Sequence, residues 1–153
     1  WAAQLISMKR LSKKELDSLR KLISHEDNTE VKRALVQALA QLPQNDLIAL
    51  SQELLCEVDP KLQRLGRYFH CMLFDEKVGL MQLESLFRNF HEETLIDRLY
   101  EVEVISKAKS QKVQARVREQ LEKIVGLLHR PILAGRVKAI IARMETEDMP
   151  HDP

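Results

Sequence analysis

Apolar residues recur at the spacing of an α-helix along almost the whole chain. In the stretch NTEVKRALVQALAQL, residues 28–42, the apolar positions are Val31, Ala34, Leu35, Ala38, Leu39 and Leu42. Intervals of three and four residues bring such side chains to one face of a helix. No stretch shows the sustained alternation and turn signals that indicate β-hairpins. The sequence therefore predicts an all-α fold.

Capping residues and prolines mark where the predicted helices begin. Ser12 and Glu15 form a capping box, in which the two side chains bond the first free amides of a helix. Asn28 and Ser110 are capping residues before apolar runs, and a proline follows the capping residue Asp59. Further helices are predicted within the first ten residues, over 46–57, 77–90 and 93–107, and from Pro131 onwards.

The intervals between these helices are only a few residues long, so consecutive helices should be antiparallel neighbours. We expect seven or eight helices in one domain over residues 1–145, which fits a chain of 153 residues. Residues 146–153 contain two prolines and no helical period, and we predict that they form a loose acidic tail. The chain begins with Trp1 rather than Met, so we expect it to be part of a longer protein.

The lengths of the apolar runs and the two cysteines indicate the cellular compartment in which the protein is expected. No apolar run approaches the roughly 18 residues that span a bilayer, and no signal-peptide pattern is present. Cys56 and Cys71 stand among apolar helical residues, so we expect buried free thiols, with a disulfide between neighbouring helices as the alternative. Free thiols fit a reducing compartment, which indicates a cytoplasmic protein or a cytosolic domain.

Motifs that carry catalysis or bind metals are incomplete. The segment HEETL, residues 91–95, begins like the zinc-protease pattern HExxH, but Leu95 stands where the second histidine ligand is needed. The glycines are too scattered to form a phosphate-binding loop. Gly66 and Gly135 lie inside predicted helices, where we expect close helix–helix approach to explain them. We predict no enzymatic activity, no cofactor and no metal site.

A short pattern recurs along the chain. Residues 28–35 read NTEVKRAL, residues 59–66 read DPKLQRLG and residues 110–117 read SQKVQARV. Each copy opens with a capping residue and carries an aliphatic residue at its fourth position. The first two copies also follow a shorter amphipathic helix, so each makes a helix-turn-helix unit. This repeated helix-turn-helix pattern resembles the HEAT family of α-helical repeats.

The resemblance implies stacked antiparallel helical hairpins, an α-solenoid with a long exposed surface for a partner. The alternative is a non-repeat helical bundle. In a HEAT-like stack the second helices line the concave face, so their exposed polar residues are candidates for partner contact. These candidates are Lys32, Arg33, Gln37, Gln63, Arg64, Arg67, Gln114 and Arg118. The predicted function is a non-catalytic module for protein–protein interaction or scaffolding.

Charge is unevenly distributed in a chain whose formal net charge is only +1. Residues 104–143, here called the basic segment, carry ten basic and two acidic residues. The basic residues are Lys107, Lys109, Lys112, Arg116, Arg118, Lys123, Arg130, Arg136, Lys138 and Arg143. Such a surface binds phosphate backbones or anionic headgroups, so nucleic-acid or anionic-surface binding is the alternative function. The segment lacks the interleaved aromatic residues of single-strand binders. The other interpretation is that the basic and acidic surfaces keep the domain in solution, and that the acidic tail folds back or pairs with a neighbouring chain.

Overall fold

The chain folds into helices joined by short loops. The computed structural model describes residues 13–25, 27–88 and 90–148, and the side chains of a few helical residues within these ranges lie outside the description. Within these ranges there are eight helices and no strand, which confirms the all-α prediction. The helices are α2 (Lys13–His25), α3 (Thr29–Ala40), α4 (Gln44–Leu55), α5 (Pro60–Phe74), α6 (Glu76–Phe87), α7 (Glu92–Ile105), α8 (Gln111–Val125) and α9 (Pro131–Asp148).

The predicted helix caps are confirmed wherever the structure describes them. The Asn28 carboxamide oxygen accepts a bond of 3.3 Å from the Val31 amide at the start of α3. Asp59 accepts from the Lys61 amide at 2.9 Å, directly before Pro60 opens α5. Ser110 caps α8 in the same manner. The predicted helix in the first ten residues and the capping residue Ser12 lie outside the described residues.

The last helix extends further than the sequence predicts. Helix α9 begins at Pro131, as expected, but it continues to Asp148 and so includes the first residues of the predicted tail. Met144 is buried, Glu145 forms an ion pair of 3.2 Å with Arg118 of α8, and the Thr146 hydroxyl donates to the carbonyl of Ala142. These contacts extend the helix beyond the last clear apolar period.

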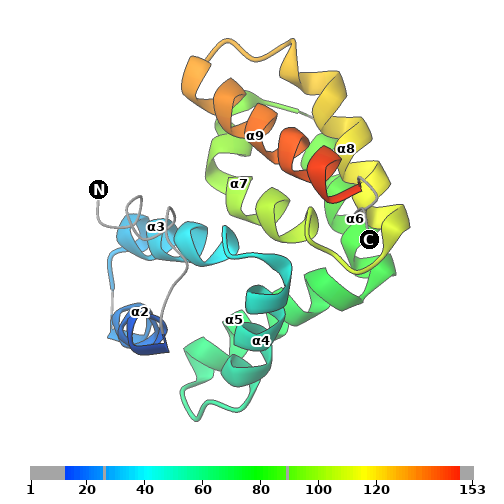
Figure 1. The fold of residues 1–153 in the computed structure, drawn as a ribbon. Coiled ribbons are helices and arrows are strands. Elements are labelled where there is room, and N and C mark those ends of the chain that lie inside the picture. The colour runs from blue at the N-terminus through cyan, green and yellow to red at the C-terminus, as the bar shows by residue number, and fades with distance from the viewer. Residues whose placement is uncertain (1–12, 26, 89, 149–153) are drawn as a thin grey trace.

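Figure 1 shows α2 to α5 at one end of the molecule and α6 to α9 at the other. Helices α4 and α5 form the most closely packed pair, α6 packs on α8, and α8 packs on α9. Helix α3 also packs on α7, although three helices separate them along the chain. One continuous apolar core runs from α3 to α9 through all of these contacts. A strict solenoid restricts contacts to adjacent units, so the α3–α7 contact departs from a simple stack.

The segment that connects α7 to α8 lies inside the molecule rather than on its surface. Residues 101–110 are here called the α7–α8 junction, and every residue from 101 to 108 is buried. The Lys107 ammonium group donates to the carbonyl of Ala40, the last residue of α3. The Gln44 side chain, at the start of α4, donates to the Lys107 carbonyl at 2.8 Å, and the Lys109 amide donates to the Leu73 carbonyl at 2.8 Å. Hydrogen bonds therefore connect the junction to α3, α4 and α5.

The two cysteines are free and exposed, so the prediction of buried thiols is wrong. Cys56 follows the last residue of α4 and caps its end. Cys71 lies on α5 between Phe69 and Met72, both buried, but its side chain projects to the outer side of the helix. The apolar neighbours in sequence face the core, and the helical period turns Cys71 away from them.

The two glycines inside helices have different surroundings. A Cβ atom on Gly66 would lie 2.7 Å from the Leu54 Cβ and 2.8 Å from the Leu55 amide nitrogen, so α4 and α5 meet there in close contact, as predicted. A Cβ atom on Gly135 would have no neighbour within 4 Å, so the close approach predicted for this glycine is wrong.

We expect opposite effects from alanine at these two positions. Gly66→Ala pushes a methyl group against the backbone of α4 and should lower the free energy of unfolding by about 1–3 kcal/mol. Gly135→Ala adds helix propensity without a clash and should raise it by up to about 1 kcal/mol. Urea denaturation followed by circular dichroism measures both changes. Equal shifts in the two variants would contradict the observed packing of α4 on α5.

Candidate functional site

The predicted partner-binding residues that the structure describes differ in exposure and in their contacts within the chain. Arg64 and Arg67 are exposed on α5, and the Arg64 guanidinium donates to the Pro60 carbonyl of its own helix at 3.4 Å. Arg118 is held between two carboxylates of its own chain. The side chains of Lys32 and Arg33 lie outside the described residues.

Gln63 and Gln114 have matching roles inside the chain. The Gln63 side chain donates to the carbonyl of Glu57 at 2.5 Å, and the Gln114 side chain donates to the carbonyl of Ala108 at 2.6 Å. In both cases the glutamine reaches back six residues and bonds the loop just ahead of its own helix. The glutamine shared by the second and third copies of the sequence pattern therefore closes a loop.

The basic segment is neutralised in part by acidic residues of the same chain. Lys107 is 2% exposed, so its place in a basic surface patch is corrected: its ammonium group is directed inward to Ala40. Ion pairs join basic residues of the segment to acidic residues on α7, α8 and α9. The pairs are Arg118 with Glu122 and Glu145, Lys123 with Glu119, Arg130 with Glu93, and Arg136 with Glu103. Arg143 donates to the Ser106 hydroxyl.

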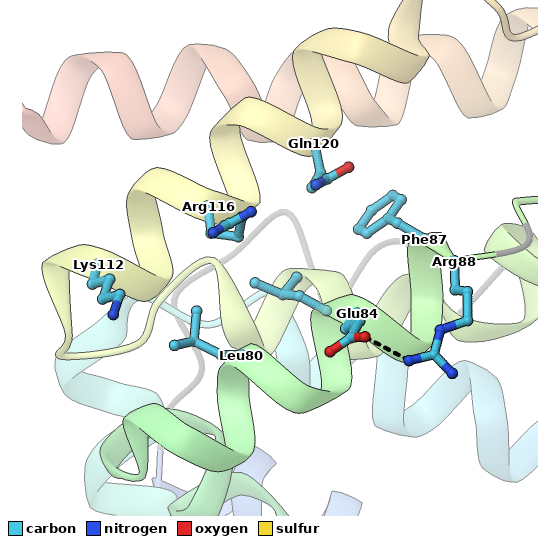
Figure 2. A pocket seen from close by; sticks show the side chains of 8 residues that line it. Leu80, Glu84, Phe87, Arg88, Lys112, Arg116 and Gln120 are labelled. Carbon is cyan, nitrogen blue, oxygen red and sulfur yellow. Dashed lines mark hydrogen bonds and ion pairs between the residues drawn. The ribbon is translucent and has the colours of Figure 1, made fainter.

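Lys112 and Arg116 are exposed and line a cleft between α6 and α8, whereas Lys109 and Lys138 are exposed outside it. The cleft has a volume of about 420 Å³ and an apolar floor formed by residues of α6. Figure 2 shows both basic side chains on α8 above Leu80, with a Glu84–Arg88 ion pair of 2.5 Å on the opposite helix. The cleft offers positive charge beside apolar surface.

A second concave site, here called the α3–α7–α9 groove, is mainly apolar. Its volume is about 520 Å³, and it is lined by Gln37, Ile96, Leu99, Arg130, Pro131, Ile132, Leu133 and Arg136. Ile132 is 85% exposed and Ile96 is 40% exposed. Two large aliphatic side chains from different helices thus meet solvent in one groove.

Polar atoms in the groove have an unusual environment. The Gln37 amide nitrogen Nε2 and the Arg136 nitrogen Nη2 are buried, and neither has a hydrogen-bond acceptor among the described residues. Arg136 Nη2 lies 3.6 Å from the Glu103 carboxylate, which balances its charge at a distance too long for a hydrogen bond. An unsatisfied buried donor destabilises a fold, and native structures contain few of them.

The lip of the groove is held by an acidic residue at the start of α7. A carboxylate oxygen of Glu92 accepts from the amides of His129 and Arg130, at 2.5 and 3.3 Å. These amides directly precede Pro131 and Ile132, so the bonds fix where α9 begins. The acids of residues 91–95, which resemble part of a metal motif in the sequence, here anchor a loop.

The exposure of Ile132 and Ile96 is not what the sequence pattern predicts, because large aliphatic residues within helical apolar series are expected in the core. A signal for Ile132 was present. The buried positions of α9 are Leu133, Val137, Ile140 and Met144. Ile132 stands one residue ahead of this series and shares its face with Arg136, one helical turn on.

Two titratable side chains in the described part of the chain have a shifted pKa, and no cluster of side chains there fits a metal ion. No group of three or more His, Cys, Asp or Glu side chains in the described part of the chain could hold a metal ion. Burial raises the pKa of the Tyr68 hydroxyl, and the Glu101 carboxylate raises it further. The hydrogen bond to Glu101 raises the pKa of Arg98. Both shifts keep the group in its ordinary protonation state at neutral pH, so neither creates a catalytic acid or base.

Comparison with protein-family models, with curated proteins and with solved structures finds no match to this chain. Among the described helices, none has the length and apolar character needed to cross a membrane. The cleft between α6 and α8 and the α3–α7–α9 groove are therefore the features from which a function can be inferred.

Proposed function

We propose that this chain is a non-catalytic module for protein–protein interaction, and that it binds its partner at the α3–α7–α9 groove. The observation that carries the proposal is the exposure of Ile132, at 85%, beside Ile96, Leu99 and Pro131 in one concave site. Exposed apolar patches with a polar rim are typical of interaction sites, since exposed aliphatic surface gains free energy when a partner covers it.

The groove also has the composition of an interface centre. Its apolar lining is flanked by Arg130 and Arg136, and each of these arginines is paired with a glutamate of α7. Arginine is enriched at interface centres, where other charged residues are depleted. A volume of about 520 Å³ is large enough to take side chains of a bound segment.

This proposal moves the binding site relative to the sequence-based face. Of the residues expected from the HEAT resemblance, Gln37 alone lines the groove. A scaffold role and a HEAT-like arrangement of hairpins stay part of the proposal, supported by the helical hairpins and by the matched loops that Gln63 and Gln114 close.

A negative charge in place of Ile132 should weaken partner binding. A phage-displayed library of random linear peptides is selected on the wild-type chain, and the affinity of the enriched peptides is measured by calorimetry. Ile132→Glu should weaken binding by more than about tenfold, because a carboxylate replaces the aliphatic contact.

The matched control is Val58→Glu, which alters an apolar side chain that is 92% exposed outside the groove. Both variants should keep the unfolding midpoint of the wild type. Equal binding by wild type and Ile132→Glu would remove the groove from the proposal.

A second candidate function is supported by the cleft between α6 and α8. Lys112 and Arg116 are exposed there and form none of the ion pairs found among the described residues. Exposed basic side chains that pair with no carboxylate among the described residues are available to a phosphate backbone or another anionic surface.

Salt dependence tests this second function. If the cleft binds nucleic acid, a labelled duplex should shift in a gel at about 50 mM salt, and affinity should fall steeply as salt rises. The double variant Lys112→Glu with Arg116→Glu should abolish the shift, whereas Lys123→Glu, which replaces a cation already paired with Glu119, should reduce it far less. The absence of any shift by the wild type would remove nucleic acid as a partner.

A further inference from the structure

We infer that the α3–α7–α9 groove recognises an extended peptide segment of a partner through neutral backbone carbonyls, which accept hydrogen bonds from Gln37 and Arg136. This inference rests on the proposed function and specifies the chemistry of the partner. It combines two observations in one site: exposed aliphatic side chains, and two donor nitrogens that have no acceptor among the described residues.

Both donor nitrogens are buried, and both belong to side chains that line the groove. Gln37 is half-buried on α3, and the Arg136 side chain is 34% exposed on α9, so part of each side chain reaches the groove surface. Turning Gln37 Nε2 toward the groove breaks no hydrogen bond among the described residues. Arg136 Nη2 makes no hydrogen bond either, but it is the nitrogen that pairs with Glu103 at 3.6 Å, so a bound acceptor has to share it with that carboxylate. A bound acceptor would relieve the free-energy penalty of an unsatisfied donor as well as add a bond.

The charge balance indicates that the acceptor is neutral. Arg136 already has the Glu103 carboxylate at 3.6 Å, and Arg130 has Glu93 at 3.3 Å. A second carboxylate beside Arg136 would lie close to Glu103, which is itself buried, and like charges in a buried site repel strongly. A peptide carbonyl supplies the acceptor without adding charge.

The form of the segment follows from the availability of its carbonyls. Inside a helix the backbone carbonyls are occupied, and only those of the last turn are open. An extended segment keeps its carbonyls open and alternates its side chains, so one apolar side chain contacts Ile132 and Ile96 while neighbouring carbonyls face the donors.

The test uses the peptides selected on the wild-type chain and compares variants that differ in one donor. Gln37→Leu should weaken peptide binding by about fivefold, the effect of one lost hydrogen bond, while the urea midpoint stays equal to or above that of the wild type. Arg136→Lys keeps the charge opposite Glu103 but loses the planar fork, and should weaken binding by a similar factor.

Gln63→Leu is the matched control. Its amide already bonds the Glu57 carbonyl, so this substitution should lower the urea midpoint and leave peptide affinity unchanged. Because the acceptor is neutral, a tenfold rise in salt should change the affinity of the wild type by less than about twofold.

The outcomes separate the inference from the function on which it rests. Peptides that need Ile132 but bind Gln37→Leu and Arg136→Lys as tightly as the wild type would overturn the carbonyl inference and keep the groove as a protein-binding site. Enriched peptides whose binding depends on a carboxylate and falls steeply with salt would also overturn it. A selection that enriches no peptide sensitive to Ile132→Glu would overturn both, as would a dimer of the chain that Ile132→Glu dissociates, since the groove would then be a self-interface.

Discussion

One buried lysine connects three helix ends. Lys107 lies beyond the end of α7, and its ammonium group donates to the carbonyl of Ala40, where α3 ends. The last carbonyls of a helix have no partner within the helix, and a cation at that end also interacts favourably with the helix dipole. The same residue accepts a bond from Gln44 through its own carbonyl. The end of α3, the start of α4 and the end of α7 are thus fixed at one point.

The α3–α7–α9 groove is a consequence of that arrangement. Helix α3 supplies Gln37, and its end is held by Lys107. Helix α9 is held against the α7–α8 junction by the bond from Arg143 to Ser106 and by the ion pair of Arg136 with Glu103. The walls of the groove therefore belong to helices that are joined to the rest of the fold by polar contacts. Most buried donors in a protein are hydrogen-bonded, and exceptions such as Gln37 Nε2 are expected at functional sites.

The local structure of this chain could be predicted from its sequence, whereas much of the long-range structure could not. The helical period, the caps at Asn28, Asp59 and Ser110, and the start of α9 at Pro131 depend on residues within a few positions of one another. A lysine in a basic stretch ordinarily indicates surface, and the burial of Lys107 depends on an acceptor 67 residues away.

The candidate site could not be predicted from the sequence, because it also depends on contacts between residues far apart in the chain. The sequence predicts Gln37 as a contact residue because it lies on a polar helix face. That its amide nitrogen lacks an acceptor among the described residues depends on how α3, α7 and α9 pack together. Ile132 belongs to an apolar helix, and its exposure depends on which face of α9 meets α8. The cysteines show the same limit, since their apolar neighbours in sequence are not their neighbours in space.

Native-state hydrogen exchange at the α7–α8 junction tests the organising role of this segment most directly. Loop amides ordinarily exchange through local opening, at a free energy far below that of global unfolding. The Lys107 amide donates to the Val104 carbonyl, and the Lys109 amide donates to the Leu73 carbonyl of α5. If the junction holds the two ends of the molecule together, both amides should exchange only through global unfolding, with the same opening free energy as the core amides of α5. Exchange through a local opening, at a clearly smaller free energy than that of the α5 amides, would contradict this role.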